Sequence, residues 1–170
     1  HRIDRPVSGI VVFAKTSKSL SRMNILLRDG GIRKSYWAVV KNKPPRDKDH
    51  LVHFLRKNEA KNISVARDEE FSGSKKAELK YEVIGKSQEY YLLRVDLLTG
   101  RHHQIRAQLA KIGCPIRGDV KYGAERSNPD GSIHLHAREI QFVHPVKKEV
   151  ITITADPPAD NLWNFFKNIN

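Results

Sequence analysis

The sequence predicts a single α+β domain. Three observations lead to this class: stretches rich in β-branched and aromatic residues recur along the chain, three segments carry apolar residues at helical spacing, and Gly, Pro and Ser mark the breaks between them. At 170 residues the chain can bury a proper core. The single cysteine, Cys114, excludes an internal disulfide framework and fits a reducing compartment, which we expect to be the cytoplasm.

The chain opens with His-Arg-Ile-Asp-Arg-Pro-Val-Ser-Gly, which places Asp4 between Arg2 and Arg5. Pro6 has no backbone N–H and favours an extended Arg5, so Asp4 is expected on a stiff loop. Positive neighbours favour the charged form of a carboxylate, and an ionised carboxylate can act as a nucleophile or a base. The same residues also fit an ordinary surface ion pair, and this stretch alone leaves both interpretations open.

Residues 9–14 form an apolar run that predicts a buried strand. Thr16 or Ser17 can cap the helix that follows, and Gly30 and Gly31 end it. The apolar side of this helix consists of Leu20, Met23, Ile25, Leu26 and Leu27.

Residues 33–40 predict a strand by their composition. Its period of two places Tyr36 on one face and Trp37 on the other. Tyr36 fits either stacking on an unpaired base or an ordinary place in the core.

The middle of the chain predicts a loop and a hairpin. Residues 41–50 are basic and Pro-rich, which indicates a loop, and within residues 51–73 we expect only a short strand at 51–55. Residues 75–84 and 90–98 form two strands joined by a turn. Later strands are expected at 139–143 and 149–154, followed by an aromatic-rich helix at 161–168.

Residues 100–113 are the second informative stretch. Ile105, Leu109 and Ile112 fall on one side of a short helix that Gly113 ends. Four donors crowd its N-terminal end: Arg101, His102, His103 and Arg106. Helix N-termini favour anions, so a carboxylate or phosphate partner is expected there, although a plain polar helix start fits equally well.

The charge of the chain points to a polyanion. The net charge is +12, and residues 1–48 hold twelve Lys and Arg against three Asp. A basic surface of this size is typical of nucleic-acid-binding proteins, although a merely soluble basic protein would also show it. No apolar run approaches the roughly 20 residues of a membrane span. The eight histidines lack the spacing of a zinc site, so we expect no metal.

Four ordered motifs resemble one family. HRIDRPVSG, RKSYWAVV, LLTGRHHQIRAQLAKIGCPIRGDVKYG and SIHLHARE…FVHP are similar to motifs of the pseudouridine synthases of the RluA type. The resemblance covers residues 1 to about 158. It implies a mixed, largely antiparallel sheet flanked by helices around a central RNA-binding cleft. It also implies isomerisation of uridine to its C-glycoside without metal or cofactor.

The resemblance also assigns roles to individual residues. Asp4 matches the catalytic aspartate, Tyr36 the tyrosine that packs on the target uracil, and Arg106 the arginine that pairs with the aspartate. Arg2 matches an arginine that helps to open the RNA around the target, and Arg101 is expected to bind substrate beside it.

Two positions depart from the family pattern. The family usually has Thr where His102 stands and often His where Gln108 stands. Neither lies in the catalytic set, so the departures concern contacts with substrate. Family members carry a strand-rich segment upstream of the first motif, so residues 1–170 are expected to be a catalytic domain that lacks it.

The resulting hypothesis is an RNA pseudouridine synthase that flips its target base. We expect it to be monomeric and to act on ribosomal RNA ahead of transfer RNA. One alternative is a non-catalytic RNA-binding module or RNA chaperone. A second is a metal-free nuclease that uses His102 and His103 as acid and base near neutral pH.

Overall fold

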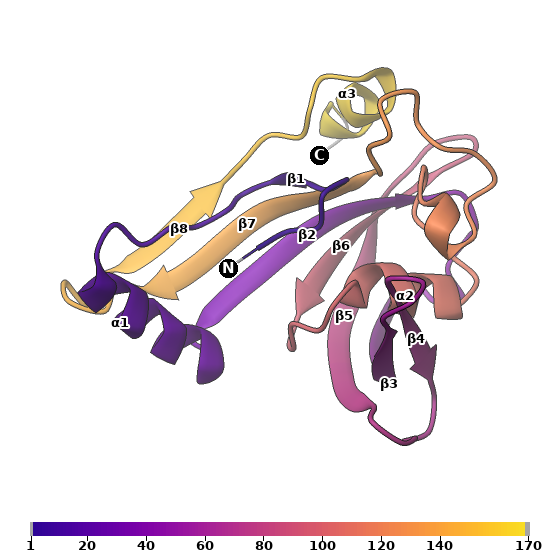
Figure 1. Cartoon of the computed structure of the whole chain (residues 1–170). Helices are drawn as coiled ribbons and strands as arrows, with labels where there is room; N and C mark the ends of the chain where they lie inside the picture. The colour runs from indigo at the N-terminus through magenta and orange to yellow at the C-terminus, as the bar shows by residue number, and fades with distance from the viewer. Residues whose placement is uncertain (1, 169–170) are drawn as a thin grey trace.

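The structure of the chain, a computed structural model, describes residues 2–168, and an eight-stranded sheet forms its centre (Figure 1). The strands are β1 (Ser8–Gly9), β2 (Ile32–Val40), β3 (Lys48–Asn58), β4 (Ile63–Arg67), β5 (Lys75–Lys86), β6 (Tyr91–Leu97), β7 (Leu135–Val143) and β8 (Val150–Thr154). They lie in the order β1–β7–β2–β6–β5–β3–β4, and β8 shares the outer edge of β7 with β1. Only β1 and β7 pair in parallel among the described strands, which confirms a mixed, largely antiparallel sheet.

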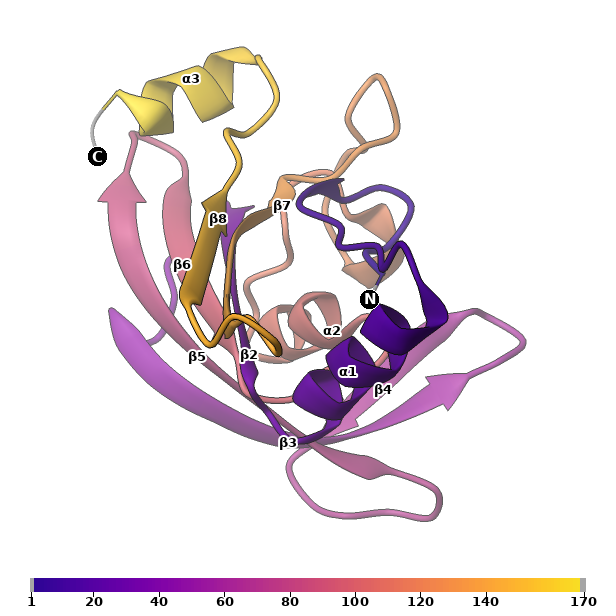
Figure 2. The same ribbon diagram turned by 90° about the vertical axis from the view of Figure 1, so that its left-hand side faces the viewer.

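Three helices flank the sheet: α1 (Ser17–Arg28), α2 (Gln104–Lys111) and α3 (Asn161–Lys167). The sheet is curved, α2 lies inside the curve, and α3 lies outside it (Figure 2). As predicted, Thr16 caps α1: its Oγ1 accepts the Ser19 N–H at 3.1 Å. No described helix has the length and apolar character needed to cross a membrane.

The two faces of β2 serve two different cores, as the period of two predicts. Tyr36, Ala38 and Val40 join the core that α2 covers. Trp37 and Val39 join a second cluster with Trp163 and Phe166 of α3. The central strand therefore carries Tyr36 on the α2 side of the sheet.

The prediction of a strand at 9–14 is wrong. Strand β1 ends at Gly9, and beyond it one backbone bond, from Ile10 N–H to the carbonyl of Ala137, continues the pairing. Ile10 and Val12 instead pack with α1 against β2 and β7, while Phe13 is 81% exposed. Apolar composition marked a segment that packs against the sheet outside the named strands, because side-chain burial does not require a place in a strand.

The sequence also underestimated β3 and missed β4. Strand β3 runs for 11 residues and places Leu51, His53 and Leu55 on its buried side. The inward His53 bonds through Nδ1 to the buried Nε2 of Gln108, 3.0 Å away. A histidine at a buried position interrupts the apolar alternation on which strand prediction depends.

Candidate active site

Asp4 lies on a turn that the sheet edge holds in place. The Val7 N–H donates to the Asp4 carbonyl at 2.9 Å, and the Ile133 N–H donates to the Pro6 carbonyl at 3.0 Å. Gly9 has a φ of +110°, and a Cβ there would lie 2.4 Å from the Ala137 carbonyl oxygen. Only glycine allows β1 to approach β7 this closely, so the turn is fixed at both ends.

Arg106 of α2 connects Asp4 to a second carboxylate. Its Nε and Nη2 donate to the two oxygens of Asp119 at 2.7 and 2.8 Å, and its Nη1 donates to Oδ2 of Asp4 at 3.2 Å. The side chains of Arg106 and Asp119 are 5% and 1% exposed. Burial by itself would lower the pKa of Arg106, but its hydrogen bonds and charge interactions with Asp119 and Asp4 raise that pKa above its ordinary value. The arginine is therefore a permanent cation beside Asp4.

His103 contacts the same oxygen of Asp4. Its Nε2 lies 3.7 Å from Asp4 Oδ2, and its Nδ1 lies 2.9 Å from the hydroxyl of Tyr122. That hydroxyl already accepts the Ser64 N–H at 2.7 Å, so it can give its own hydrogen to His103 Nδ1 and leave Nε2–H facing the carboxylate. Burial is the largest influence on His103 and lowers its pKa to about 4, so its ring is neutral near pH 7.

The contacts on Asp4 are one-sided. The shortest contacts of Arg106 and His103 are both with Oδ2, and among residues 2–168 no side chain is hydrogen-bonded to Oδ1. The Asp4 side chain is 29% exposed, so the carboxylate is open to solvent. One oxygen is thus anchored and the other is available to a bound molecule.

A pocket of about 260 Å³ surrounds Asp4. All five residues expected at the site line it: Arg2, Asp4, Tyr36, Arg101 and Arg106. Burial and the charge of Asp4 raise the pKa of Tyr36 to about 12, so Tyr36 keeps its proton and presents a neutral ring. We call this space, with these five residues and His102 and His103 in its wall, the Asp4 pocket.

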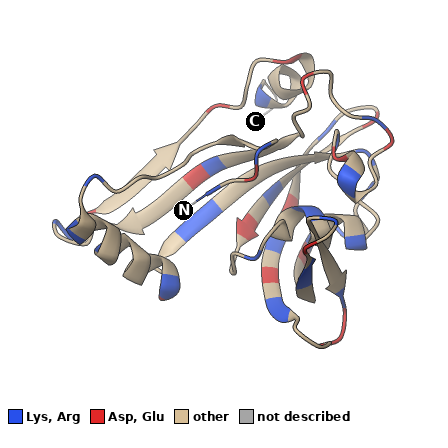
Figure 3. Ribbon diagram, viewed as in Figure 1, with Lys and Arg blue, Asp and Glu red and all other residues tan. Residues whose placement is uncertain are grey.

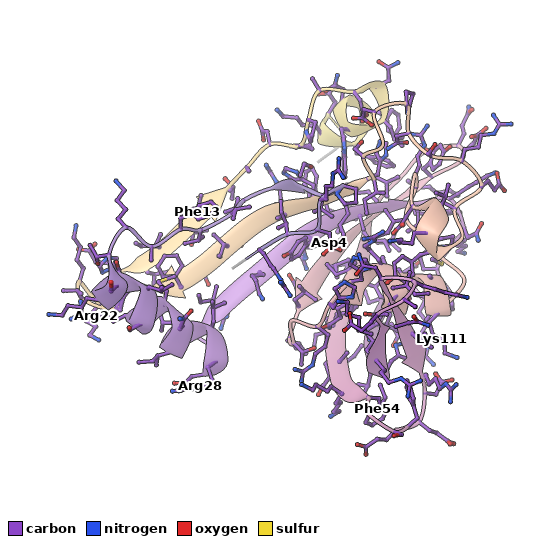
Figure 4. All side chains as sticks on the ribbon, viewed as in Figure 1. Asp4, Phe13, Arg22, Arg28, Phe54 and Lys111 are labelled. Atoms are coloured by element: carbon purple, nitrogen blue, oxygen red, sulfur yellow. The ribbon has the colours of Figure 1, made fainter. Side chains whose placement is uncertain are left out.

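Cations line the pocket and a groove that shares several of its residues. Lys34 lines it and also lines a neighbouring groove of about 1430 Å³ together with Arg101 and Arg33. Burial lowers the pKa of Lys34, and no described carboxylate pairs with it. Figure 3 shows Lys and Arg on β2, at the end of α1 and along β5. Figure 4 shows Asp4 near the middle of the molecule, between Arg28 of α1 and Lys111 of α2.

Sequence reasoning missed three residues that organise the site: Asp119, Tyr122 and Ser64. Asp119 and Tyr122 follow Gly113 in a stretch for which the sequence predicts no helix or strand, and Ser64 lies in a segment without a clear pattern. An anion is found at the start of α2, as expected: it is Asp4, which Arg106 hydrogen-bonds at 3.2 Å and His103 approaches to 3.7 Å. Gln108 lies away from the pocket, against His53, and His102 lies in the pocket wall. No group of three or more metal-ligating side chains occurs within residues 2–168.

Comparison with known proteins relates this chain to enzymes of one kind. Residues 1–111 match the family model of RNA pseudouridylate synthases. The ribosomal large subunit pseudouridine synthase C of Vibrio cholerae is 32% identical over 161 residues, which is 91% of this chain and 50% of that protein. The tRNA pseudouridine synthase C of Haemophilus influenzae is 31% identical over 186 residues, or 99% of this chain and 76% of that protein.

Solved structures agree on the fold. The human RNA pseudouridylate synthase domain containing 4 superposes with a TM-score of 0.78 at 21% identity, covering 99% of this chain and 74% of that one. The chain spans about half the length of several of the relatives that it matches. Taken with the family match over residues 1–111, these findings show that the chain belongs to the RNA pseudouridylate synthase family.

Proposed function

We propose that this chain isomerises uridine to pseudouridine in RNA and that Asp4 is the nucleophile. The observation that carries the proposal is the asymmetry of Asp4: Oδ2 is held by Arg106 at 3.2 Å, while Oδ1 is left open in the Asp4 pocket. Family membership and the names of the relatives support the reaction class.

The reaction asks little of the protein besides a nucleophile and a held base. The N1–C1′ bond of uridine breaks, the freed uracil turns, a C5–C1′ bond forms, and the hydrogen on C5 leaves as a proton while N1 gains one. Splitting this exchange into steps is the task of a covalent nucleophile, and Oδ1 can attack either uracil C6 or ribose C1′. The permanent charge of Arg106, 3.2 Å from Oδ2, holds the carboxylate in place for that attack.

The proposed substrate must enter the pocket as an unpaired nucleotide. A base inside a helix is out of reach of a carboxylate in a pocket, so the nucleotide must be flipped out and held by stacking. Tyr36 suits this task, because its ring lines the pocket next to Asp4 and stays neutral. Its high pKa makes it a poor proton acceptor near pH 7, so stacking is its main role.

RNA is the expected partner because of charge as well as family. Lys34, Arg2 and Arg101 lie at the pocket, where they can contact phosphates on either side of a flipped nucleotide. Such contacts release counterions, so the affinity for RNA should fall as salt rises. We propose ribosomal RNA ahead of transfer RNA, a monomeric enzyme, a cytoplasmic location and a catalytic domain that comprises residues 1–170.

The nuclease alternative is disfavoured by the state of the histidines. Acid–base cleavage needs one protonated and one neutral imidazole, whereas burial lowers the pKa of both His102 and His103. Burial therefore disfavours the protonated imidazole that would have to act as the acid near neutral pH.

Nucleoside analysis tests the proposal. Total cellular RNA is incubated with the chain or with its Asp4→Asn variant, then digested, and pseudouridine is separated from uridine by chromatography. Asp29→Asn is a matched control, because Asp29 is an exposed carboxylate whose ion pair within residues 2–168 is with its neighbour Arg28. We expect new pseudouridine with the wild type and the control and none with Asp4→Asn. Shortened RNA would support the nuclease, and bound but unchanged RNA would support the binding module.

A further inference from the structure

Ser64 of β4 fixes the hydrogen positions on His102. Its Oγ lies 2.6 Å from the carbonyl oxygen of His102 and 2.9 Å from Nδ1 of the same residue. A carbonyl can only accept, so the single hydroxyl hydrogen of Ser64 points to it. Ser64 Oγ must then accept a hydrogen from His102 Nδ1. The neutral ring of His102 therefore carries its proton on Nδ1 and a free lone pair on Nε2.

The Nε2 atom of His102 has no partner among residues 2–168. Within residues 2–168, the buried side-chain atoms without a hydrogen-bond partner belong to Gln108 and His134. Because Nε2 of His102 also has no partner but is not among these buried atoms, it is not sealed in the core. His102 lines the Asp4 pocket. The residue that carries this free acceptor thus lies in the wall of the proposed nucleotide site.

The ring is also held still. It stacks on His103 with ring centroids 3.8 Å apart and 21° between the planes. Burial lowers the pKa of His102, which keeps Nε2 unprotonated near pH 7. An acceptor fixed by a stacking partner and a hydrogen bond is preorganised for a ligand that supplies a donor.

We propose that His102 Nε2 accepts a hydrogen bond from the nucleotide bound in the Asp4 pocket. This rests on the proposed function. Uridine offers one ring donor, N3–H, and a 2′-hydroxyl on the ribose, and either matches a lone pair. A Thr hydroxyl, which the resembled family usually has here, can donate or accept, whereas Nε2 of His102 in this tautomer can only accept. Nε2 of His102 therefore favours a nucleotide that presents a hydrogen-bond donor to it.

Nitrogen-15 NMR of the histidine side chains tests the contact directly. The protein carries Asp4→Asn to prevent turnover, and the ligand is a synthetic RNA hairpin containing the uridine that nucleoside mapping identifies, with nitrogen-15 in its uracil. In the free protein we expect the Nδ1–H tautomer of His102. On binding we expect the Nε2 resonance to shift to that of a hydrogen-bonded acceptor, while His50, on β3 and 43% exposed, stays unchanged.

The same spectra identify the donor. A scalar coupling between uracil N3 and His102 Nε2 identifies the base as the donor. If Nε2 shifts without that coupling, and the shift disappears when the RNA carries 2′-deoxyuridine at this position, the donor is the 2′-hydroxyl of the ribose. An Nε2 that already carries hydrogen in the free protein, or whose resonance ignores the bound RNA, overturns the proposal.

Kinetics give an independent readout. His102→Asn keeps a donor near Ser64 Oγ but has no atom at the Nε2 position, and His102→Gln restores an amide there. We expect kcat/KM to fall on the order of 10- to 100-fold in His102→Asn, with partial recovery in His102→Gln and none of this loss in His50→Asn. An active wild type with an equally active His102→Asn contradicts the inference but leaves the proposed function intact. A wild type that neither isomerises nor binds RNA contradicts the proposed function instead.

Discussion

Two clusters of polar side chains that contain buried histidines differ in the hydrogen-bonding atoms that they leave unused. The pocket cluster consists of Asp4, Ser64, His102, His103, Arg106, Asp119 and Tyr122. The α3 cluster consists of Ser8, Asn128, His134, His136 and Asp160. Each contains two histidines whose pKa burial lowers, so residue type and protonation alone do not distinguish them.

The α3 cluster directs its hydrogen bonds toward the protein. His136 meets Ser8 Oγ at 2.8 Å through Nδ1 and the Ala155 carbonyl at 3.0 Å through Nε2. His134 bonds to Asn128 at 3.0 Å, and its Nε2 lies 3.1 Å from Asp160 Oδ2 without the alignment of a hydrogen bond. These contacts connect the segment before α3 to β7 and to the chain entering β1.

The pocket cluster keeps two acceptors open, Oδ1 of Asp4 and Nε2 of His102. The contrast shows how burial and the number of hydrogen-bond partners can distinguish residues that serve the fold from residues that face a substrate. Substitutions in the pocket cluster should change activity, and substitutions in the α3 cluster should change stability.

Arg106→Leu should have the largest effect, because Arg106 both stabilises the fold and contacts Asp4 in the pocket. It leaves Asp119 buried and uncompensated, which should lower the unfolding free energy by about 3–5 kcal/mol and abolish activity. Arg106→Lys keeps the charge but loses the two-pronged contact with Asp119, so it should retain more stability than activity. Urea unfolding and nucleoside analysis measure the two effects. Wild-type stability in Arg106→Leu would contradict the buried ion cluster.

His136→Leu should have the next largest effect and should act on the fold alone. It removes the hydrogen-bond partner of the Ser8 hydroxyl and one hydrogen-bond donor to the Ala155 carbonyl. This loss should lower the unfolding free energy by about 1–3 kcal/mol. Below the unfolding transition, activity per folded molecule should match the wild type. A loss of activity without a loss of stability would break the comparison.

His103→Asn should affect activity and leave stability nearly unchanged. Asparagine tolerates the φ of +50° at this position and can still bond to Tyr122, but it removes the Nε2–H that faces Asp4. We expect kcat to fall about tenfold, which corresponds to about 1.4 kcal/mol, with KM little changed. An unchanged kcat would show that the 3.7 Å approach of His103 to Asp4 does not assist the carboxylate.

Acid should weaken the fold through the histidines of both clusters. Their pKa values are lower in the folded chain than the ordinary value of 6.5, so the unfolded state takes up protons first as the pH falls. The unfolding free energy should be unaffected by these groups above about pH 7 and should decrease below about pH 6.5, by up to about 1.4 kcal/mol per pH unit for each proton. Urea unfolding between pH 7 and pH 5 measures the slope, which should be smaller in His136→Leu. A stability that rises on acidification would contradict the neutral histidines.

The sequence predicted the class of the fold, the strands around Tyr36 and the hairpin at 75–98, because their apolar periods are regular. It also predicted a shared site for Asp4, Tyr36 and Arg106, which line one pocket, because each of them stands in a motif that is continuous in sequence. It did not identify Ser64, which reaches the pocket only because β4 pairs with β3 beside α2. It missed Asp119 for a similar reason, because the role of Asp119 in the site depends on a contact with Arg106 that a turn of the chain creates.

The most direct test of the central claim is release of tritium from RNA labelled at uridine C5. Formation of the C5–C1′ bond must expel that hydrogen, so release reports the reaction itself. The wild type and Asp29→Asn should release tritium, whereas Asp4→Asn should bind the same RNA with similar affinity and release on the order of 10⁴-fold less. Equal release by Asp4→Asn and the wild type would show that the open oxygen of Asp4 is not the nucleophile.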